Sequence, residues 1–344
     1  MNSMKPKQKL LYYIFFTGLI LLSLVSSHAW GRNYVKIATI GGVPPHLDLT
    51  QEPQKLVEQM IAFWEGELAQ VLPDKPDLIV LPEACDRPSG MTTEVQLQYF
   101  KVRGNQVMEY FASVAKNNHC YIAFGMKHQL EDGSWRNSCI LLDREGNTNG
   151  IYNKNFPTIG EMEAGIKAGK EAPLFQCDFG SVACAICFDL NFDELRIRYA
   201  AQRPDIIVFP SMYHGGLVQA NWAYSCRSYF VSSIAIVSLR SEIRNPMGDV
   251  VATSTNYFDY TVSTINLDYC LAHLDYNWSK LEELKKKYGP EVTIHDPGEI
   301  GSVMITSESD QVSAKEMAKE FEITLLDDYL EDSREYRHKP GIME

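Results

Sequence analysis

The 344-residue chain is poor in positive charge and, beyond its N-terminus, has no long apolar run. It carries 32 lysines and arginines against 44 aspartates and glutamates, which gives a formal net charge of −12. Because a nucleic-acid-binding protein needs a basic face to meet phosphates, we expect no nucleic-acid partner. No apolar segment after the first 25 residues approaches the roughly 20 residues that cross a bilayer as a helix, so we expect a soluble body.

The chain also lacks cysteine pairs at the spacing of a metal site. Cys184 and Cys187 form one Cys-x-x-Cys, but no second pair follows, and a structural zinc site takes four such ligands. We therefore expect no metal, and no other cofactor. Cys120, Cys139, Cys177 and Cys184 lie in apolar segments, where cysteine usually acts as a small buried hydrophobe. The even total of eight also allows disulfides, whose pairing the sequence does not assign.

The N-terminus has the pattern of an export signal. Three lysines precede an apolar run over residues 10–25, and Ser27-His28-Ala29 supplies small residues where a signal peptidase cuts. We predict a signal peptide over residues 1–29 and export of the protein to a secreted or periplasmic location. The alternative is an uncleaved N-terminal anchor, which would then be the protein's contact with a membrane.

The body of the chain alternates strand-like and helix-like segments, which indicates an α/β architecture. Apolar residues from Leu56 to Leu68 recur at the spacing of one helix face. We predict helices at Pro53–Leu72, Glu94–Asn117, Phe192–Gln202 and Gln219–Ser232. We predict strands at Val35–Ile40, Leu78–Leu81, Tyr121–Gly125, Ser138–Asp143, Gly150–Asn153, Leu174–Asp178, Val182–Ile186, Ile206–Phe209, Ile234–Leu239 and Tyr260–Asn266.

One apolar strand pattern occurs twice. The segment Pro76–Glu83 is echoed by Pro204–Ser211, and each follows a helical stretch and ends at a proline. The repeat suggests two similar half-sheets, packed face to face with helices outside. After Asp268 the pattern changes to short charged helices, predicted at Leu281–Tyr288 and Ser313–Phe321, and an acidic tail.

Three strand-like runs each end at a residue with reactive chemistry, namely Glu83, Lys154 and Cys187. Cys187 lies where a buried strand turns into a helix, and a helix start favours a thiolate. Three motifs in this order resemble the signature regions of the nitrilase (carbon–nitrogen hydrolase) superfamily: Leu81-Pro82-Glu83, Tyr152-Asn153-Lys154 with Pro157 and Gly160-Glu161, and Ile186-Cys187-Phe188-Asp189 with Glu194.

The resemblance spans about Tyr34 to Asp268 and carries several expectations. It implies a four-layer α-β-β-α sandwich, two packed mixed sheets with helices outside, in a catalytic domain over residues 30–270. It implies an enzyme, with a C-terminal extension over residues 271–344 that packs at the interface of a homodimer or larger assembly. Because the cysteine is followed by Phe188-Asp189 where strict nitrilases usually have Trp-Glu, we expect an amide-type small molecule as substrate before a nitrile.

Each of the four polar residues has an expected role in hydrolysis of a C–N bond. Cys187 would attack the carbonyl carbon and form a thioester. Glu83 would act as general base and acid, and Lys154 would stabilise the oxyanion together with the backbone N–H of Phe188. Glu161 would hold the ammonium of Lys154 in place.

Other residues are predicted to support the site. Asp189, Glu194 and Arg196 should organise the turn that carries the cysteine through hydrogen bonds and ion pairs at the helix start. Phe188, Tyr213 and His214 are candidate substrate-binding residues, because they follow the cysteine or the second proline-terminated strand, on the edge where the site should lie.

Three other functions remain open. The fold could serve as a non-catalytic binding protein, or the acyl-enzyme could pass its acyl group to an amine. Cys184-x-x-Cys187 could be a redox pair, although strand geometry would point the two sulfurs to opposite faces. The identity of the amide, N-carbamoyl or nitrile substrate stays open.

Overall fold

The computed structural model describes residues 33–342, so the predicted signal peptide over residues 1–29 lies outside the described part. Within residues 33–342, no helix has the length and apolar character needed to span a membrane. All eight cysteines lie in this part and are free thiols. Six are buried, and Cys177 and Cys187 are partly exposed. The prediction of buried thiols is confirmed at Cys120, Cys139 and Cys184 and was wrong at Cys177.

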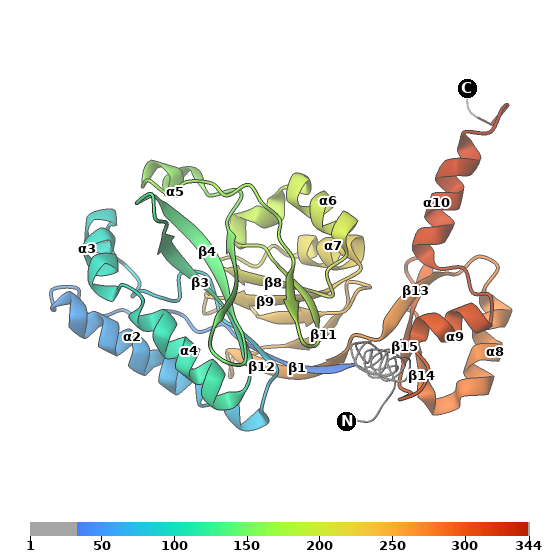
Figure 1. Cartoon of the computed structure of the whole chain (residues 1–344), viewed down its shortest axis with the longest axis horizontal. Helices are drawn as coiled ribbons and strands as arrows, with labels where there is room; N and C mark the ends of the chain where they lie inside the picture. The colour runs from blue at the N-terminus through green and yellow to red at the C-terminus, as the bar shows by residue number, and fades with distance from the viewer. Residues whose placement is uncertain (1–32, 343–344) are drawn as a thin grey trace, which may run out of the picture.

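Two six-stranded mixed sheets form the centre of the molecule (Figure 1). In each sheet three strands run parallel in the middle and antiparallel strands flank them. The first sheet has the order β12 (Tyr260–Asn266), β1 (Tyr34–Ile40), β2 (Leu78–Val80), β3 (Tyr121–Gln129), β4 (Trp135–Leu142), β5 (Thr148–Asn153). The second has the order β11 (Val250–Thr253), β10 (Glu242–Arg244), β9 (Tyr229–Ile234), β8 (Ile206–Ser211), β7 (Gly180–Cys184), β6 (Phe175–Cys177).

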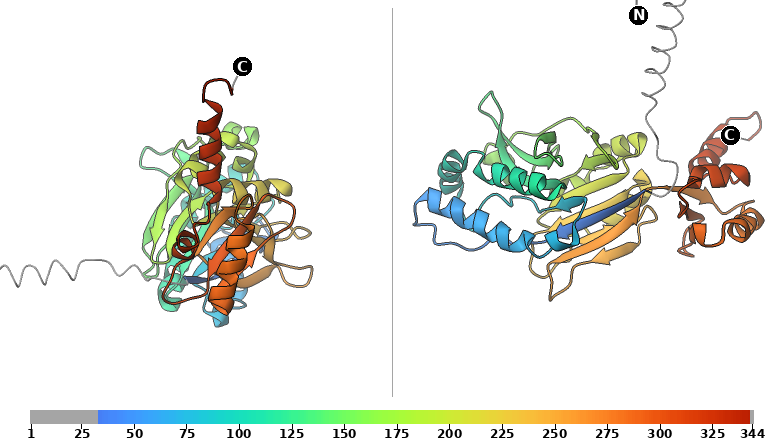
Figure 2. Two further views of the ribbon diagram at one scale, coloured as in Figure 1. Left: turned by 90° about the vertical axis from the view of Figure 1, so that its right-hand side faces the viewer. Right: turned by 60° about the horizontal axis from the view of Figure 1, so that its bottom comes forward.

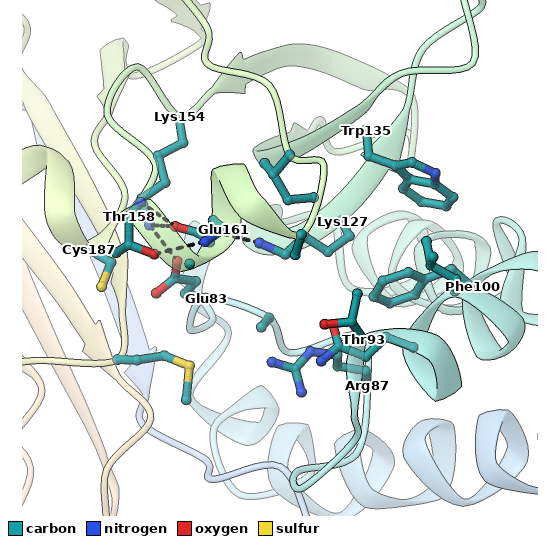
Figure 3. Close-up of a pocket in the computed structure, with 17 residues that line it drawn as sticks. Glu83, Arg87, Thr93, Phe100, Lys127, Trp135, Lys154, Thr158, Glu161 and Cys187 are labelled. Carbon is teal, nitrogen blue, oxygen red and sulfur yellow. Dashed lines mark hydrogen bonds and ion pairs between the residues drawn. The ribbon is translucent and has the colours of Figure 1, made fainter.

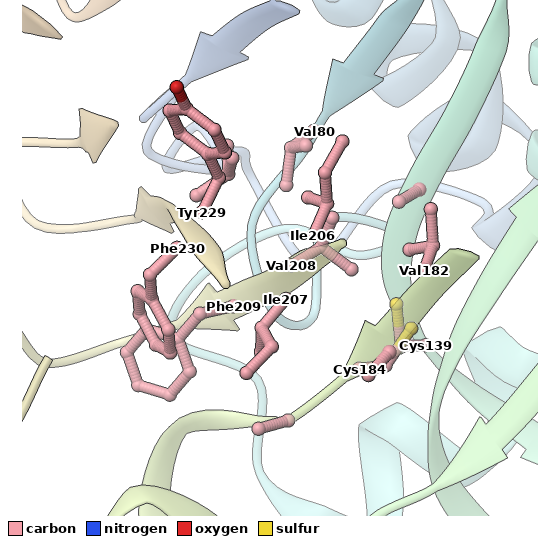
Figure 4. Packing of buried hydrophobic residues seen from close by; sticks show 14 of the residues in the cluster. Val80, Cys139, Val182, Cys184, Ile206, Ile207, Val208, Phe209, Tyr229 and Phe230 are labelled. Carbon is pink, nitrogen blue, oxygen red and sulfur yellow. The ribbon is translucent and has the colours of Figure 1, made fainter. Parts of the chain in front are cut away.

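Alternate side chains of the first sheet pack in two different cores. Leu78 and Val80 of β2 point toward the second sheet, and Ile79 between them points toward the helices. The repeat seen in the sequence corresponds to β2 and β8, which pack against each other from the two sheets (Figure 4). Apolar residues on both faces explain why these two strands read as continuous apolar runs.

Helices cover the outer face of each sheet, which confirms the α-β-β-α sandwich. Figure 1 shows α2 and α4 on one side of the sheets and α6 and α7 on the other. Trp64 of α2 is fully buried against the first sheet, and Trp222 of α7 against the second. The covering helices are α2 (Pro53–Leu68), α3 (Thr93–Arg103), α4 (Gln106–Asn118), α6 (Asp193–Gln202) and α7 (Leu217–Cys226).

Several predicted boundaries were wrong, among them the end of the helix expected over Pro53–Leu72, which stops at Leu68. The helix expected over Glu94–Asn117 is two helices, because Gly104 takes a left-handed φ of 49° between them. The helix expected over Gln219–Ser232 ends at Cys226, where Arg227 is left-handed. The strand that follows is β9, at Tyr229–Ile234, and not the predicted Ile234–Leu239.

The C-terminal segment forms a small unit with its own core, beside the sandwich (Figures 1 and 2). A three-stranded antiparallel sheet orders β13 (Tyr269–His273), β15 (Ser302–Ser307) and β14 (Val292–His295). The two predicted helices are present as α8 (Trp278–Tyr288) and α9 (Ala314–Glu320), and α10 (Leu326–Arg337) follows. The strands and α10 were not predicted. A role of this unit at a subunit interface stays a prediction.

Candidate active site

A cavity of about 410 Å³ brings together Glu83, Lys154, Glu161 and Cys187 (Figure 3). This volume lies toward the lower end of the roughly 300–1,000 Å³ that small-molecule sites occupy. The four residues come from four separate segments, after β2, after β5, in the short helix α5 (Ile159–Glu163) and after β7. The structure therefore assembles the complete predicted polar set in one place.

The turn after β2 presents Glu83 to the cavity. Ala84, the next residue, has a left-handed φ of 54°, which turns the chain sharply away from the strand. Gly125 of β3 lies against this turn, and a Cβ on it would sit 2.6 Å from the Cα of Glu83. A side chain at position 125 would therefore displace the Glu83 backbone.

Glu83 and Glu161 are joined through one buried ammonium group. The Lys154 Nζ lies 2.9 Å from Glu83 Oε1 and 2.8 Å from Glu161 Oε2. Burial disfavours the charged form of this amine, but the two carboxylates outweigh that effect and raise the pKa of Lys154. Lys154 is thus held as an ammonium ion although its side chain is almost completely buried.

Two residues that the sequence analysis did not identify complete the network. The Lys127 Nζ lies 2.7 Å from Glu161 Oε1, and Asn137 Nδ2 donates to Glu83 at 2.7 Å and to Glu161 at 2.6 Å. Lys127 of β3 and Asn137 of β4 are paired directly across the sheet. Both are polar residues next to apolar strand segments, and this pattern could have identified them as candidate site residues from the sequence.

Glu161 is fixed by its own helix start. The Thr158 hydroxyl accepts from the Glu161 N–H at 3.2 Å, and Glu161 Oε2 accepts from the Thr158 N–H at 3.0 Å, which forms a capping box. Burial alone would raise the pKa of this carboxyl, but Lys127 and Lys154 hold it well below its ordinary value. Glu161 is therefore an anion at neutral pH and orients both ammonium groups.

Cys187 begins a five-residue 3-10 helix, η2 (Cys187–Asn191), and has a left-handed φ of 47°. The expectation of a stabilised thiolate was wrong for this resting state. Burial, then the negative charge of Glu83, outweigh Lys154 and raise the pKa of the Cys187 thiol to about 12. Cys187 consequently needs a base to become a nucleophile.

Asp189 organises the turn that carries Cys187, as predicted, whereas Arg196 pairs with Asp193 within α6. Asp189 Oδ2 accepts from the Ile186 N–H at 2.9 Å and from the Tyr152 hydroxyl at 2.7 Å, and its Oδ1 accepts from the Phe156 N–H at 2.8 Å. These bonds tie the chain just before the cysteine to the segment just after Lys154. Burial of this carboxyl is the largest effect and raises its pKa to about 6.

Replacing Asp189 with asparagine should destabilise the fold by about 2 kcal/mol, because an amide nitrogen cannot accept the bonds made by one carboxylate oxygen. Turnover should fall as well, since the Cys187 turn loosens. Urea unfolding and steady-state kinetics measure the two effects. Asp193→Asn, at an exposed carboxylate of α6, is the matched control, and equal behaviour of the two variants would contradict the assigned role.

Comparison with known proteins identifies the family. A model of the carbon–nitrogen hydrolase family matches residues 37–267. The chain belongs to the carbon–nitrogen hydrolase family. It is an enzyme of the nitrilase superfamily, as its three motifs indicated.

The similar proteins are distant relatives of this carbon–nitrogen hydrolase. A probable nitrilase of Schizosaccharomyces pombe is 25% identical over 174 residues, 50% of this chain and 61% of that protein, so the match covers less than two thirds of that relative. The omega-amidase NIT2 of Homo sapiens is 23% identical over 228 residues, 61% of this chain and 80% of that protein.

A solved structure supports the fold. It is a variant of the amidase from Nesterenkonia sp. AN1 with covalent addition of the acetamide moiety of fluoroacetamide at its active-site cysteine. It is similar to this carbon–nitrogen hydrolase with a TM-score of 0.59 and 14% identity, over 75% of this chain and 97% of that one. At this identity the likeness concerns the fold alone.

The three candidate substrate-binding residues of this carbon–nitrogen hydrolase do not line the cavity. Phe188 packs edge-on against Phe192. Tyr213 packs against Phe209 in the second sheet, and His214 Nε2 lies 3.3 Å from Glu242 Oε1. Their neighbour Met212 does line it, together with residues that the sequence analysis did not identify, among them Arg87, Thr93, Gln96, Phe100, Trp135 and Ile166.

Two alternatives for this carbon–nitrogen hydrolase can be set against the structure. Cys184 is buried between the sheets beside Cys139 (Figure 4), whereas Cys187 lines the cavity. The two cysteines therefore lie in different environments, and this arrangement does not support a redox pair. Over residues 33–342, no group of three or more metal-ligating side chains is placed to hold an ion.

Proposed function

We propose that the protein hydrolyses the C–N bond of a small amide or N-carbamoyl compound through a thioester on Cys187. The observation that carries the proposal is the Lys154 ammonium, fixed between the Glu83 and Glu161 carboxylates in the cavity that Cys187 lines. A binding protein has no need of a thiol, a base and a fixed cation in one cavity.

In the first half of the reaction Glu83 takes the proton of the Cys187 thiol as the sulfur attacks the carbonyl carbon. Asn137 and Lys154 both donate to Oε1 of Glu83, which leaves Oε2 for that proton. The oxyanion of the tetrahedral intermediate lies against the Lys154 ammonium, and one such donor is worth about 3 kcal/mol in the transition state. The C–N bond then breaks, Glu83 protonates the departing amine, and the thioester remains.

In the second half a water molecule attacks the thioester. Glu83 takes a proton from this water, and the same Lys154 ammonium stabilises the second oxyanion. When the C–S bond breaks, the proton on Glu83 returns to the sulfur, and the carboxylic acid leaves. Glu161 and Lys127 keep their charges throughout and hold Lys154 in place.

The proposal agrees with the names of similar proteins. One relative is called an omega-amidase, and a structural neighbour is an amidase with an adduct on its active-site cysteine. Transfer of the acyl group to an amine would share the first half of the reaction, and only the second nucleophile would differ.

A panel of amides, N-carbamoyl compounds and nitriles, followed by mass spectrometry, tests the proposal. We expect acid and amine products from the wild-type protein, none from Cys187→Ala, and an acyl adduct on Cys187 after rapid quenching. Added hydroxylamine traps the acyl-enzyme as a hydroxamate, and a new amide formed with an added amine in place of the acid reveals acyl transfer. Undiminished turnover by Cys187→Ala would overturn the mechanism.

A further inference from the structure

The charged side chains that line the cavity do not balance. Among the described residues that line it, Glu83 and Glu161 are anionic, and Arg87, Lys127 and Lys154 are cationic. The two lysines are paired with the two glutamates. Arg87 is therefore the surplus positive charge in the cavity.

Arg87 has few partners within the described part of the protein. Its Nη1 donates to the Pro88 carbonyl at 3.2 Å, and its Nε is buried without a hydrogen-bond partner. The carboxylate next to it in the chain, Asp86, is already engaged by Arg103. A guanidinium has five N–H donors in a fixed fork, so most of its hydrogen-bonding capacity is unused here.

The Arg87 side chain is directed into the site. Figure 3 shows its guanidinium pointing away from Phe100 and Trp135, toward the side where Glu83 and Cys187 lie. The turn that presents Glu83 also carries Arg87, four residues later. The base and the surplus cation are thus fixed relative to each other by one short segment.

An unpaired and partly desolvated guanidinium is costly unless an anion meets it. The fork of an arginine matches a carboxylate with two parallel hydrogen bonds. The cavity also has an apolar wall, where the rings of Phe100 and Trp135 lie 5.3 Å apart. A carboxylate joined to an amide by a few methylene groups would fit this cavity. Its charge would balance the surplus cation, its two oxygens would pair with the guanidinium, and its methylene groups would lie against the apolar wall.

We propose that the substrate carries a carboxylate besides the amide, and that Arg87 binds this carboxylate while Cys187 attacks the amide carbon. Monoamides of short dicarboxylic acids and N-carbamoyl amino acids belong to this class. The inference rests on the proposed function and narrows it, and it makes Arg87 the residue that sets the substrate class. With the carboxylate bound, the charges that line the cavity balance.

Two matched series of amides test this inference: aliphatic amides, and monoamides of the same length that end in a carboxylate, such as succinamate and glutaramate. We expect kcat/KM of the wild type to favour the carboxylates by about a hundredfold, the size of a bidentate charged contact. Arg87→Gln should remove most of this preference for the carboxylate series, and Arg87→Lys should keep part of it. Arg334→Gln, at an exposed arginine of α10, should leave the ratio unchanged.

The outcomes separate this inference from the proposed function. Equal rates on both series in the wild type, or an unchanged ratio in Arg87→Gln, would overturn the role of Arg87 and leave C–N hydrolysis intact. If neither series is hydrolysed, titration of glutarate into the Cys187→Ala variant tests whether the cavity binds a carboxylate. Binding that is lost in Cys187→Ala/Arg87→Gln supports carboxylate recognition without the reaction, and no binding overturns it.

Discussion

Replacing Glu83 with glutamine should lower kcat by about a thousandfold while making the Cys187 thiol easier to ionise. General acid–base catalysis typically contributes 10²–10⁴-fold, and Glu83 is placed to serve both halves of the reaction. Its negative charge is also one cause of the raised pKa of Cys187, next to burial. Removing that charge leaves Lys154 to act on the sulfur alone, so the pKa of Cys187 should fall below about 12.

The two effects have opposite signs and are measured separately. Steady-state kinetics gives the loss of turnover, and the pH dependence of alkylation by iodoacetamide gives the pKa of the thiol. An inert variant whose Cys187 alkylates at lower pH than wild type is the expected result. Glu282→Gln, at an exposed glutamate of α8, controls for the change in net charge. A thiol pKa that rises in Glu83→Gln would show that Glu83 does not face the sulfur.

Replacing Lys154 with methionine should cost both activity and stability. Loss of the oxyanion donor should lower kcat by about 10²–10³-fold. The change also leaves Glu83 buried beside Glu161 without the ammonium that joins them. Removing one partner of a buried ion pair typically destabilises by about 3–5 kcal/mol, so the free energy of unfolding should fall by about that amount.

The loss of stability in Lys154→Met should become smaller as the pH falls. The pKa of Glu161 is held below its ordinary 4.5 in the folded protein, so its pairing stabilises the fold above that pH and the stabilisation is lost as the pH falls. The gap in stability between wild type and Lys154→Met should therefore narrow below about pH 4.5.

Urea unfolding at several pH values measures the gap between wild type and Lys154→Met. The double variant Lys154→Met/Glu161→Gln should recover part of the stability and none of the activity. Lys286→Met, at an exposed lysine of α8, should change neither. A stability difference between wild type and Lys154→Met that stays constant from neutral pH to pH 4 or below would contradict the stabilising role given to the Lys154–Glu161 ion pair.

The central strands were predictable because they are apolar on both faces. The run Leu78–Val80 is buried toward the second sheet and toward the helices, and its echo at Ile206–Ser211 has the same surroundings. The strands that were missed give weaker patterns. Strand β11 is half-exposed along its length, and every residue of β15 is buried although two are serine and one is threonine.

The proposed catalytic set followed from one local rule, a reactive residue within three positions of the end of a buried strand. That rule identifies Glu83, Lys154 and Cys187, because the strand ends converge on one edge of the sandwich. It cannot identify Lys127 or Arg87, which reach the cavity from within a strand and from a turn. The contact of Lys127 with Glu161 joins residues 34 positions apart, and only the pairing of β3 with β4 and the placement of α5 create it.

The left-handed backbone at Cys187 links the stability of this turn to the identity of its side chain. A non-glycine residue in that conformation costs about 1 kcal/mol or more, whereas glycine adopts it freely. Mutation of codon 187 toward glycine would therefore relax the turn and remove the sulfur at the same time. The strain of this turn and the thiol are therefore coupled, because the substitution that best relaxes the backbone at position 187 is one that removes the sulfur.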